Sequence, residues 1–599
     1  MAADLGKLDY PFDWDYILRK QKSLRRTLLA RENITYIEKR IAILCGSTVD
    51  DIRNTLELFL LQSGIRPSFW QSEYNKYYED AVFGNAELDA FAPDMILIFT
   101  SAVNLIEKPA QGESAAAVQA HLEAEMERFA RVWEGLAQYH AVVIQNNMEL
   151  PYAIGLGSLA AVEPYGISRY IEMLNQRFAA YAASHEGFYL HDLHGLAAHV
   201  GLCRWHNPAQ YFAYKFAMDY DVMPKVALSL AVMIRAILGK NRKCLVLDLD
   251  NTLWGGVIGD DGMENIQIGH ETAVAEGYTA FQRYVRDLKE RGIILAVCSK
   301  NEETIARQGF SHPDSVLKLE DFAAFYANWE PKDQNIRAIA EELSIGTDSM
   351  VFLDDNPAER ALVYVSLPEV AVPEVRSAEG FSFIRALEDN GYFEPIAISE
   401  DDRRRAATYA QNKERRALAA TAGNYDDFLR SLDMQAEIAP FQPVYYDRIA
   451  QLTNKTNQFN LTTRRYTRAD IVAMAEEGRC ITLYGRLADR FGDNGLVSVV
   501  VGEMRERELH ILLWLMSCRV LKRGMEQAML DALVSRAREA GCTCIIGYYF
   551  PTKKNQMVAS LFADFGFEEM EQEGAGTKWK LGLDGYQKKA RFIKVEEQG

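Results

Sequence analysis

The chain has 599 residues, which is too long for one hydrophobic core and predicts three or four domains. Its apolar content of 48% and charged content of 25% are those of an ordinary globular protein, and no block of like charges is long enough to form a tail. The net charge of −18 argues against general nucleic-acid binding, which usually needs a basic face.

The N-terminus and the apolar segments argue against a secreted or membrane protein. The first residues, from Met1 to Gly6, lack the basic and apolar parts of a signal peptide. The longest apolar helix candidate, Val226 to Leu238, is too short to span a bilayer and contains Arg235. None of the eight cysteines forms a Cys-x-x-Cys pair, so zinc is not expected. We therefore expect a cytoplasmic enzyme.

Residues 1–220 are predicted to form the first domain. Apolar strands at Ile41–Leu44, Met95–Phe99 and Ala141–Ile144 are separated by helical stretches such as Ala115–Gln138 and Ser168–Ser184. Alternating strands and helices indicate a parallel α/β sheet.

The order of these elements resembles a flavodoxin-like or SGNH-hydrolase-like domain. Such hydrolases place a nucleophilic serine after the first strand, where this chain has Gly46-Ser47-Thr48. The expected Gly-Asp-Ser is absent, and the late Asp-x-x-His is not intact around Asp192 and His194, although His206 could substitute. We therefore favour a degenerate domain for docking or substrate covering over an active esterase.

A second domain is predicted over residues 221–395, and its first strand ends in two carboxylates. The apolar run Leu245–Leu247 is typical of a central parallel strand covered on both faces, and Asp248, Asp250 and Thr252 follow it. Open α/β sheets bind ligands at the carboxyl ends of their strands. Because two neighbouring carboxylates repel each other, a cation or a shared proton is implied, and Mg²⁺ is the simplest choice.

Three later pieces follow in order along the chain. A strand at Ile293–Cys298 ends at Ser299, and Lys332 stands in Trp329-Glu330-Pro331-Lys332. A further strand, Met350–Leu353, ends in Asp354-Asp355-Asn356-Pro357. Together with Asp-x-Asp-x-Thr, these pieces resemble the motifs of haloacid-dehalogenase-type (HAD) phosphotransferases.

The HAD resemblance implies a role for each motif. Asp248 would accept the phosphoryl group, Asp250 would be the general acid and then the base, and Lys332 would neutralise the nucleophile and the phosphate. The resemblance also implies a phosphate-binding hydroxyl at Ser299, and the predicted contacts extend to Thr252, Lys300 and Asn301. The predicted metal ligands are Asp248, Asp250, Asp354 and Asp355.

The spacing of these motifs leaves no room for a separate cap domain. The interval from Thr252 to Ser299 holds a turn-rich flap and one amphipathic helix, at about Ala273–Arg291, and the interval from Ser299 to Lys332 holds only short helices. A capless site is open. It suits a phosphate carried on something large, or one covered by a neighbouring domain.

A charged helical linker is expected over residues 396–423, a third domain over 424–584 and a tail over 585–599. The third domain alternates strands such as Glu508–Met516 and Cys544–Tyr549 with a helix at Arg523–Ala540, and this pattern resembles a GNAT-type acyltransferase. The expected fold class is thus α/β throughout: a flavodoxin/SGNH-like parallel sheet, a capless HAD domain and a mixed GNAT-like domain.

A possible phosphate loop precedes the long helix of the third domain. In Ser517–Gly524, Arg519 and Gly524 match the GNAT pattern Arg/Gln-x-x-Gly-x-Gly/Ala, whereas Lys522 stands at the first glycine. Free amides at a helix start favour a pyrophosphate or a phosphopantetheine phosphate, and Lys522 and Arg523 add positive charge.

Several longer strings in this chain are unusually specific: Asp248–Gly262, Cys298–Asn301, Asp354–Pro357, Lys455–Arg465, Asp489–Gly495 and Ser517–Arg519. They are similar to signatures of the FkbH-like family. This resemblance implies a glyceryl transferase and phosphatase, which takes 1,3-bisphosphoglycerate, loses both phosphates and loads a glyceryl group onto the phosphopantetheine thiol of an acyl carrier protein. The product would feed polyketide-type extender units or tetronates.

The residue that holds the acyl group stays open. Cys518, at a strand end before a helix and beside Arg519, is the first candidate, because both neighbours would lower the pKa of its thiol. Cys298, directly before Ser299, is the second, and direct transfer without a cysteine is the third.

Polar loops and basic residues are the expected contacts for substrate and carrier. The amide-rich and arginine-rich string Asn457–Arg465 is predicted to meet substrate or carrier through Asn457, Asn460 and Arg464. Because carrier proteins are usually acidic, docking needs a local positive patch. The candidates are Lys522, Arg523, Lys553 and Lys554.

Three other functions compete with this one. The first is a phosphatase whose GNAT-like domain no longer transfers acyl groups. The second is an acetyltransferase using acetyl-CoA, with the HAD domain as a regulator, although Lys522 in the phosphate loop disfavours ordinary CoA use. The third is a scaffold, which the intact aspartates argue against.

Overall fold

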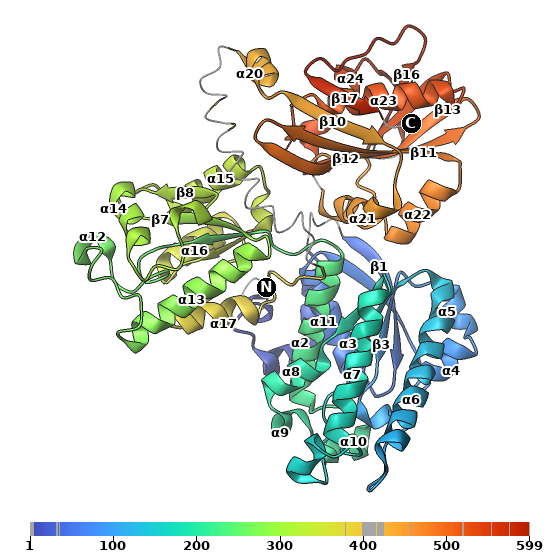
Figure 1. Cartoon of the computed structure of the whole chain (residues 1–599), viewed down its shortest axis with the longest axis vertical. Helices are drawn as coiled ribbons and strands as arrows, with labels where there is room; N and C mark the ends of the chain where they lie inside the picture. Colours follow the sequence, from blue (N-terminus) through green and yellow to red (C-terminus); the bar gives the residue numbers. More distant parts are fainter. Residues whose placement is uncertain are drawn as a thin grey trace. The chain divides into compact units, whose positions relative to one another are not determined.

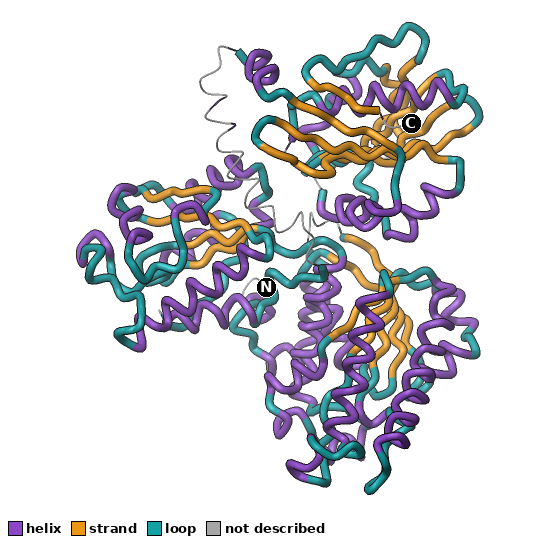
Figure 2. The backbone as a smooth tube through the Cα atoms, viewed as in Figure 1, coloured by secondary structure: helices purple, strands orange, loops and turns teal. Residues whose placement is uncertain are grey.

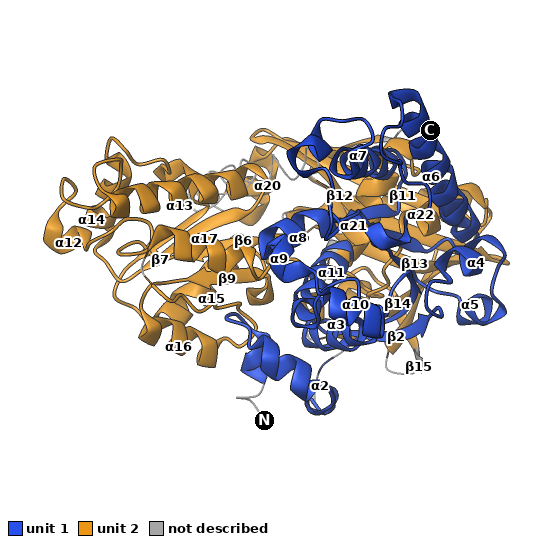
Figure 3. Ribbon diagram, turned by 90° about the horizontal axis from the view of Figure 1, so that it is seen from below, with its two compact units in different colours: residues 1–237 blue, residues 238–599 orange. Residues whose placement is uncertain are grey.

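The chain folds into two compact units, residues 1–237 and 238–599 (Figure 3). The predicted linker falls mostly outside the described residues, as do Asn457, Cys518, Arg519 and Lys553. The computed structural model describes residues 5–31, 34, 36–377, 379–397, 415, 418, 424–456, 458–517, 520–552, 554–573 and 576–597.

The first unit is built on a five-stranded parallel sheet of order β2-β1-β3-β4-β5 (Figures 1 and 2). Side chains of α4, α6 and α7 pack with Ala42, Leu44, Ile96 and Ile98 in one core on a face of this sheet. The elements in chain order are α2 (Trp14–Leu29), β1 (Ile37–Cys45), α3 (Asp50–Gln62), β2 (Ile65–Gln71), α4 (Tyr77–Val82), α5 (Ala86–Phe91), β3 (Met95–Phe99), α6 (Ala115–Leu136), β4 (Val142–Asn146), α7 (Ile167–Ser184), β5 (Phe188–His191), α8 (Leu193–Val200), α9 (Leu202–Trp205), α10 (Pro208–Tyr214) and α11 (Met223–Ile237).

Two strands and one boundary of this unit differ from the sequence prediction. Strands β2 and β5 were not foreseen; β2 contains Pro67 and lies at the sheet edge, where a missing N–H is tolerated. The boundary at residue 220 cuts off α11, which belongs to the first unit. Its apolar side chains, including Val226, Leu230 and Ile234, are buried, and the helix packs against α3.

The second unit begins with a four-stranded parallel sheet of order β8-β7-β6-β9. Leu245 and Leu247 face a core shared with α13 and α17, whereas Cys244 and Val246 face a core shared with α15 and α16. The prediction of a central strand covered on both faces is confirmed. The elements are β6 (Cys244–Leu247), α12 (Ile258–Asp261), α13 (Ala273–Glu290), β7 (Ile294–Ser299), α14 (Glu303–Gln308), β8 (Ala324–Ala327), α15 (Lys332–Leu343), β9 (Met350–Leu353), α16 (Pro357–Ser366) and α17 (Gly380–Glu388).

The second unit also contains an eight-stranded mixed sheet of order β15-β16-β14-β13-β12-β11-β10-β17. Its pairs β13/β14 and β10/β17 are parallel, and the others are antiparallel. The elements are α20 (Tyr425–Ser431), β10 (Met434–Ala439), α21 (Tyr446–Lys455), α22 (Arg468–Glu476), β11 (Cys480–Asp489), β12 (Gly492–Arg505), β13 (Glu508–Met516), α23 (Met525–Glu539), β14 (Cys544–Tyr549), α24 (Leu561–Asp564), β15 (Glu568–Glu573), β16 (Gly576–Gly582) and β17 (Ile593–Glu597).

The predicted tail over 585–599 contains a strand of the mixed sheet, β17. Within it, β17 pairs with β10 in parallel, from Met434 opposite Ile593 to Ile438 opposite Glu597. The alternation of apolar and charged residues in this strand suits a sheet edge with one face toward the core. The expected α/β fold class is confirmed. Within the described part of the chain, no helix combines the length and apolar character needed to cross a membrane.

One buried carboxyl group in the first unit lacks a full set of partners. Glu149, just after β4, is 1% exposed. Its Oε1 accepts a hydrogen bond from the Ala102 N–H at 3.4 Å, and its buried Oε2 has no partner among the described residues. Burial raises the pKa of Glu149 to about 7. The folded state therefore holds this group neutral at pH values where the unfolded chain ionises it.

Replacing Glu149 with Gln is expected to stabilise the first unit above pH 7. The wild-type carboxyl contributes full stability below its unfolded pKa and loses it as pH rises through about 7, at a cost of roughly 3 kcal/mol. Thermal unfolding of the full chain at pH 5 and pH 8 tests this. The variant should unfold at a higher temperature than wild type at pH 8 only. Glu172→Gln, on the exposed side of α7, is the control, and an equal gain there would contradict the explanation.

Candidate active site

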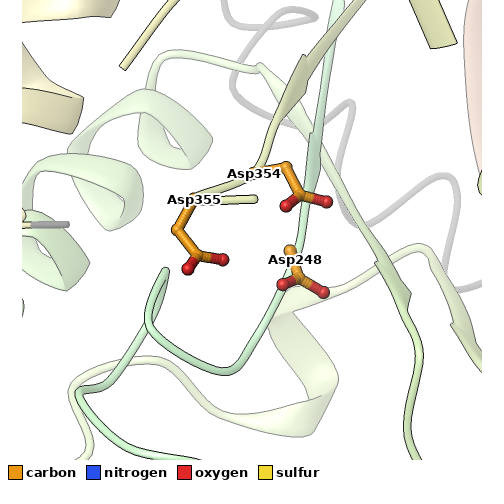
Figure 4. A group of neighbouring side chains, drawn as sticks. All are labelled: Asp248, Asp354 and Asp355. Atoms are coloured by element: carbon orange, nitrogen blue, oxygen red, sulfur yellow. The ribbon is translucent and has the colours of Figure 1, made fainter. Parts of the chain in front are cut away.

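Three carboxylates meet at the carboxyl ends of two neighbouring strands. Leu247 of β6 lies opposite Leu353 of β9 in parallel register, so the residues that follow both strands leave the sheet side by side. Oxygen atoms of Asp248, Asp354 and Asp355 lie within 4.8 Å of one another. Figure 4 shows these three side chains around a common space. The sheet thus assembles the acidic cluster that the sequence predicted.

A buried lysine lies against this cluster. Lys332 is the first residue of α15, its side chain is 2% exposed, and its Nζ lies 2.9 Å from Asp248 Oδ1. The same Nζ donates a hydrogen bond to Asp354 Oδ2. Burial opposes the charge on Lys332, but the carboxylates of Asp248 and Asp354 outweigh it and raise its pKa. The two carboxylates therefore favour the charged form of Lys332.

One lysine does not balance three carboxylates. Burial, followed by the negative charge of Asp248, raises the pKa of Asp354 to about 7, and the same causes raise the pKa of Asp355. Asp248 Oδ1 is buried without a hydrogen bond of good geometry. Hard oxygen donors with surplus negative charge are what a divalent cation such as Mg²⁺ requires. The residues present fit such an ion.

Asp250 lies outside this carboxylate group, although the sequence predicted it as a metal ligand. Its Oδ1 accepts hydrogen bonds from Trp254 Nε1 at 2.9 Å and from the Ile258 N–H at 3.1 Å, and its Oδ2 accepts one from Asn301 Nδ2 at 2.9 Å. Burial raises the pKa of Asp250. Three donors fix its orientation while burial favours the protonated form, which suits a general acid.

The remaining predicted phosphate contacts separate into two groups. Ser299 is buried at the end of β7, the strand next to β6, and the buried Thr252 Oγ1 accepts a hydrogen bond from the Asp355 N–H at 3.2 Å, which places Thr252 in the site. Asn301 reaches the site through Asp250. Lys300, by contrast, pairs with Glu359 of α16 at 2.6 Å, which differs from the predicted phosphate contact.

Cys298 lies in the core below the site. Its side chain is fully buried, and its Sγ points to the carbonyl oxygen of Lys332 at 3.7 Å. Burial raises the pKa of the Cys298 thiol despite the nearby Lys332 ammonium. Because the thiolate is the nucleophile, this environment opposes an acyl-carrying role.

Two residues that position the site were not singled out from the sequence. Trp254 orients Asp250, as described above. Arg360, in the first turn of α16, donates from Nη1 to the carbonyl oxygens of Asp354 at 2.8 Å and Asp355 at 2.7 Å, which fixes the loop carrying both carboxylates. The sequence did contain a signal for Arg360. It follows the acidic loop by one helical turn, so its side chain can reach back to the carbonyl groups of that loop.

The possible phosphate loop of the mixed sheet is partly closed by its own residues. Gly524, with φ of +92°, caps α23, and Lys522 has φ of +62°. The Lys522 N–H donates to Glu526 Oε1 at 2.9 Å, and Arg523 pairs with the buried Asp489 at 3.2 Å. The Lys522 amide and the Arg523 guanidinium, which were expected to bind a phosphate, are therefore already bonded to acidic side chains of the same domain.

The string that contains Asn460 is built into the sheet. Strands β13 and β14 pair over only three residues each, from Glu508 to His510 and from Cys544 to Ile546. Beyond that point, residues 459–462 lie between the two chains. The Leu461 N–H donates to Trp514 O at 3.1 Å, and the Phe550 N–H donates to Leu461 O at 3.0 Å. Of the three predicted contacts, Asn457 lies outside the described residues, Asn460 is buried, unlike the expected substrate contact, and Arg464 is exposed.

Comparisons with known proteins now identify the family. Residues 21–235 match the N-terminal domain of FkbH. The N-terminal part of protein BF1531 from Bacteroides fragilis, solved with its phosphatase domain complexed with Mg, is 33% identical, with a TM-score of 0.58, over 63% of this chain and 99% of that chain. This chain belongs to the FkbH family. This FkbH-family chain carries a phosphatase-type domain whose acidic cluster could bind a metal.

Acetyltransferases are similar to a smaller part of this FkbH-family chain. The ribosomal-protein-S18-alanine N-acetyltransferase from Escherichia coli is 11% identical, with a TM-score of 0.21, over 26% of this chain and 100% of that chain. Ard1 from Thermoplasma volcanium is 18% identical, with a TM-score of 0.19, over 24% of this chain and 94% of that chain. Among curated protein sequences, none matches this chain.

Replacing Lys332 with Met is expected to destabilise the four-stranded sheet domain. The substitution leaves Asp248 and Asp354 facing each other without their buried cation, at a cost of about 3 kcal/mol near pH 8. The loss should shrink toward pH 5, where the carboxyls can take up protons. Urea unfolding in the presence of a chelator measures it. Lys300→Met removes a partly exposed pair and should cost less than about 1 kcal/mol; equal losses would contradict the central role of Lys332.

Proposed function

We propose that this FkbH-family chain loads a glyceryl group from 1,3-bisphosphoglycerate onto the phosphopantetheine thiol of an acyl carrier protein and removes both phosphates, for polyketide or related biosynthesis. The observation that carries the proposal is the cluster of Asp248, Asp354 and Asp355 around the buried Lys332. The family resemblance of the longer sequence strings supplies the substrate and the carrier.

The proposed cofactor is Mg²⁺, held by the carboxylates of Asp248, Asp354 and Asp355. The Mg named in the BF1531 structure and the oxygen-only donor set support this choice. When bound, Mg²⁺ would offset the negative charge of a phosphoryl group beside the aspartates.

The side chains of the site suit removal of the ester phosphate. A carboxylate oxygen of Asp248 attacks phosphorus, the bond from phosphorus to the ester oxygen breaks, and the leaving oxygen takes a proton from Asp250. Water then attacks the phosphorus bound to Asp248, and Asp250 takes a proton from that water. The bond between phosphorus and the Asp248 oxygen breaks, so inorganic phosphate leaves and the Asp248 carboxylate is restored. Lys332 offsets the charge of Asp248 throughout, and the donors from Trp254 and Asn301 hold Asp250 in place.

The acyl phosphate needs no such machinery. It is already activated, so a thiolate can attack its carbonyl carbon and expel inorganic phosphate. The sulfur is that of Cys518, or that of the carrier in direct transfer. The buried Cys298, with its raised pKa, is the weakest of the three routes.

Asp248→Asn is expected to stop removal of the ester phosphate. Without the nucleophilic carboxylate, release of this phosphate should fall by a factor of ~10³ or more, and the three-carbon unit should retain it. To test this, the protein is incubated with 1,3-bisphosphoglycerate and phosphopantetheinylated carrier. The release of phosphate and the mass of the carrier are then measured. Asp260→Asn, an exposed acid of α12, is the matched control. A carrier that never gains mass with wild-type protein would contradict glyceryl transfer.

The cysteine variants are expected to separate the acyl-transfer routes. Intact-protein mass spectrometry after incubation with 1,3-bisphosphoglycerate should show an acyl adduct that persists in Cys298→Ala and disappears in Cys518→Ala, because burial suppresses the Cys298 thiolate. An adduct that disappears only in Cys298→Ala would reverse this assignment. Carrier acylation at the wild-type rate in both variants would indicate direct transfer.

A phosphatase without acyl transfer is the second candidate, and specific contacts favour it. The Lys522 amide and the Arg523 guanidinium are already engaged, and residues 459–462 fill the space where β13 and β14 separate. The same contacts disfavour a CoA-dependent acyltransferase. If the protein is a phosphatase without acyl transfer, wild-type protein mixed with 1,3-bisphosphoglycerate and carrier releases phosphate, and the mass of the carrier stays unchanged.

A further inference from the structure

The exposed face of helix α2 is strongly basic in an otherwise acidic chain. Its apolar residues Ile17, Leu18, Leu24 and Leu28 are buried against the first unit. The helix carries five basic residues and one acidic residue, Asp15, whereas the whole chain has a net charge of −18. All five basic residues are exposed: Arg19, Lys20, Lys22, Arg25 and Arg26.

Among the residues that the structure describes, most of this positive charge has no carboxylate partner. Arg25 pairs with Glu57 of α3 at 2.8 Å. Across the described ranges of the chain, no carboxylate lies at salt-bridge distance from Lys20, Lys22 or Arg26. Like charges three and four residues apart, as in Lys22, Arg25 and Arg26, destabilise a helix. Packing of the first unit gives no reason for this arrangement, whereas an anionic partner does.

A cavity of about 490 Å³ adjoins the basic face. It is lined by Lys22 and Arg25 of α2, by Arg53 and Glu57 of α3, and by the edge strand β2 around Phe69. Of the three cations that line this cavity, Arg25 pairs with Glu57 and Arg53 with Asp50, whereas Lys22 has no carboxylate partner among the described residues. Arg53 is held by Gln71 Oε1 at 2.9 Å and by Asp50 at 3.3 Å, so the cavity is a formed feature rather than a loose group of side chains.

We propose that α2 and this cavity form the docking surface for an acidic helix of the acyl carrier protein. Arg19, Lys22 and Arg26 follow one another along the helix over roughly 10 Å, a length that matches successive acidic side chains rather than one small anion. The adjoining cavity, lined by Lys22 and Arg25, can receive an acidic side chain beside the middle of that row. This inference rests on the proposed function for the identity of the partner.

Two other anionic partners fit less well. Nucleic acid needs a broad basic surface on the domain, whereas the cations here lie along a single helix. A small phosphate would be met by one or two cations and would leave the remainder of the row without a role. Arg523, which the sequence offered as a docking residue, is already paired with Asp489, so α2 is the stronger basic surface.

The test compares two charge-reversal variants of the full-length protein. Lys22→Glu with Arg26→Glu reverses two exposed cations of α2. Arg177→Glu with Arg204→Glu, on exposed positions of α7 and α9, changes the net charge equally. The probe is a phosphopantetheinylated acyl carrier protein, and its Kd is measured by calorimetry at low salt and at about 1 M salt, where charges are screened within about 3 Å.

The α2 variant should bind the carrier about tenfold more weakly than wild type at low salt and should lose most of the salt dependence. The control variant should stay close to wild type. Thermal unfolding of both variants shows that they are folded, and Lys22→Gln with Arg26→Gln should give an intermediate Kd. Equal weakening in both reversal variants, or in neither, would overturn the proposal.

Additional probes separate the alternative partners. If inorganic phosphate at millimolar concentration, or a short oligonucleotide, loses binding in the α2 variant while the carrier does not, the surface serves that anion and the proposal is wrong. The two proposals also fail separately. A carrier that binds through α2 but is never acylated would leave docking intact and contradict glyceryl transfer. An α2 variant that acylates the carrier normally, with Kd and KM for the carrier unchanged from wild type, would leave glyceryl transfer intact and contradict docking through α2.

Discussion

The contact of one buried ammonium group with two buried carboxylates governs the arrangement of the phosphatase-type domain. Parallel register between β6 and β9 forces Asp248 and Asp354 into proximity, and their mutual repulsion would oppose that register. Lys332 removes the conflict because it reaches both side chains from the start of α15. Thus the lysine that neutralises the proposed nucleophile also makes the sheet geometry possible.

Continuous apolar runs made the central strands predictable, whereas the edges of the sheets were not. Both β6 and β9 are buried on both faces and carry little but aliphatic residues. Strand β2 is interrupted by Pro67, and β17 alternates apolar with charged residues in only five positions. Such short strands acquire their structure from a neighbour already in place, so their own sequence contains a weak signal.

Motif spacing predicted the acidic cluster, because strand ends in a parallel sheet converge without further information. It could not predict which way each neighbouring side chain turns. Lys300 and Asn301 are adjacent in sequence, yet one pairs with Glu359 on α16 and the other supports Asp250. In the mixed sheet, Glu526 and Asp489 satisfy the very groups that a phosphate would need. Contacts between residues far apart in the chain decided these cases.

The negative charge of the protein constrains both the phosphatase-type site and the proposed docking of the carrier. The phosphatase-type site holds Asp248, Asp354 and Asp355 against the buried Lys332, with the Arg360 guanidinium on the backbone behind them, so it repels a phosphate unless further positive charge is present. The chain as a whole, at −18, also repels an acidic carrier. An enzyme of this composition can bind anions only where cations are concentrated locally. Among the described elements, α2 concentrates them on an exposed face, and the aspartate cluster is suited to recruit one as a divalent ion. The same physical constraint would therefore account both for a metal at the proposed chemical step and for the basic helix at the surface.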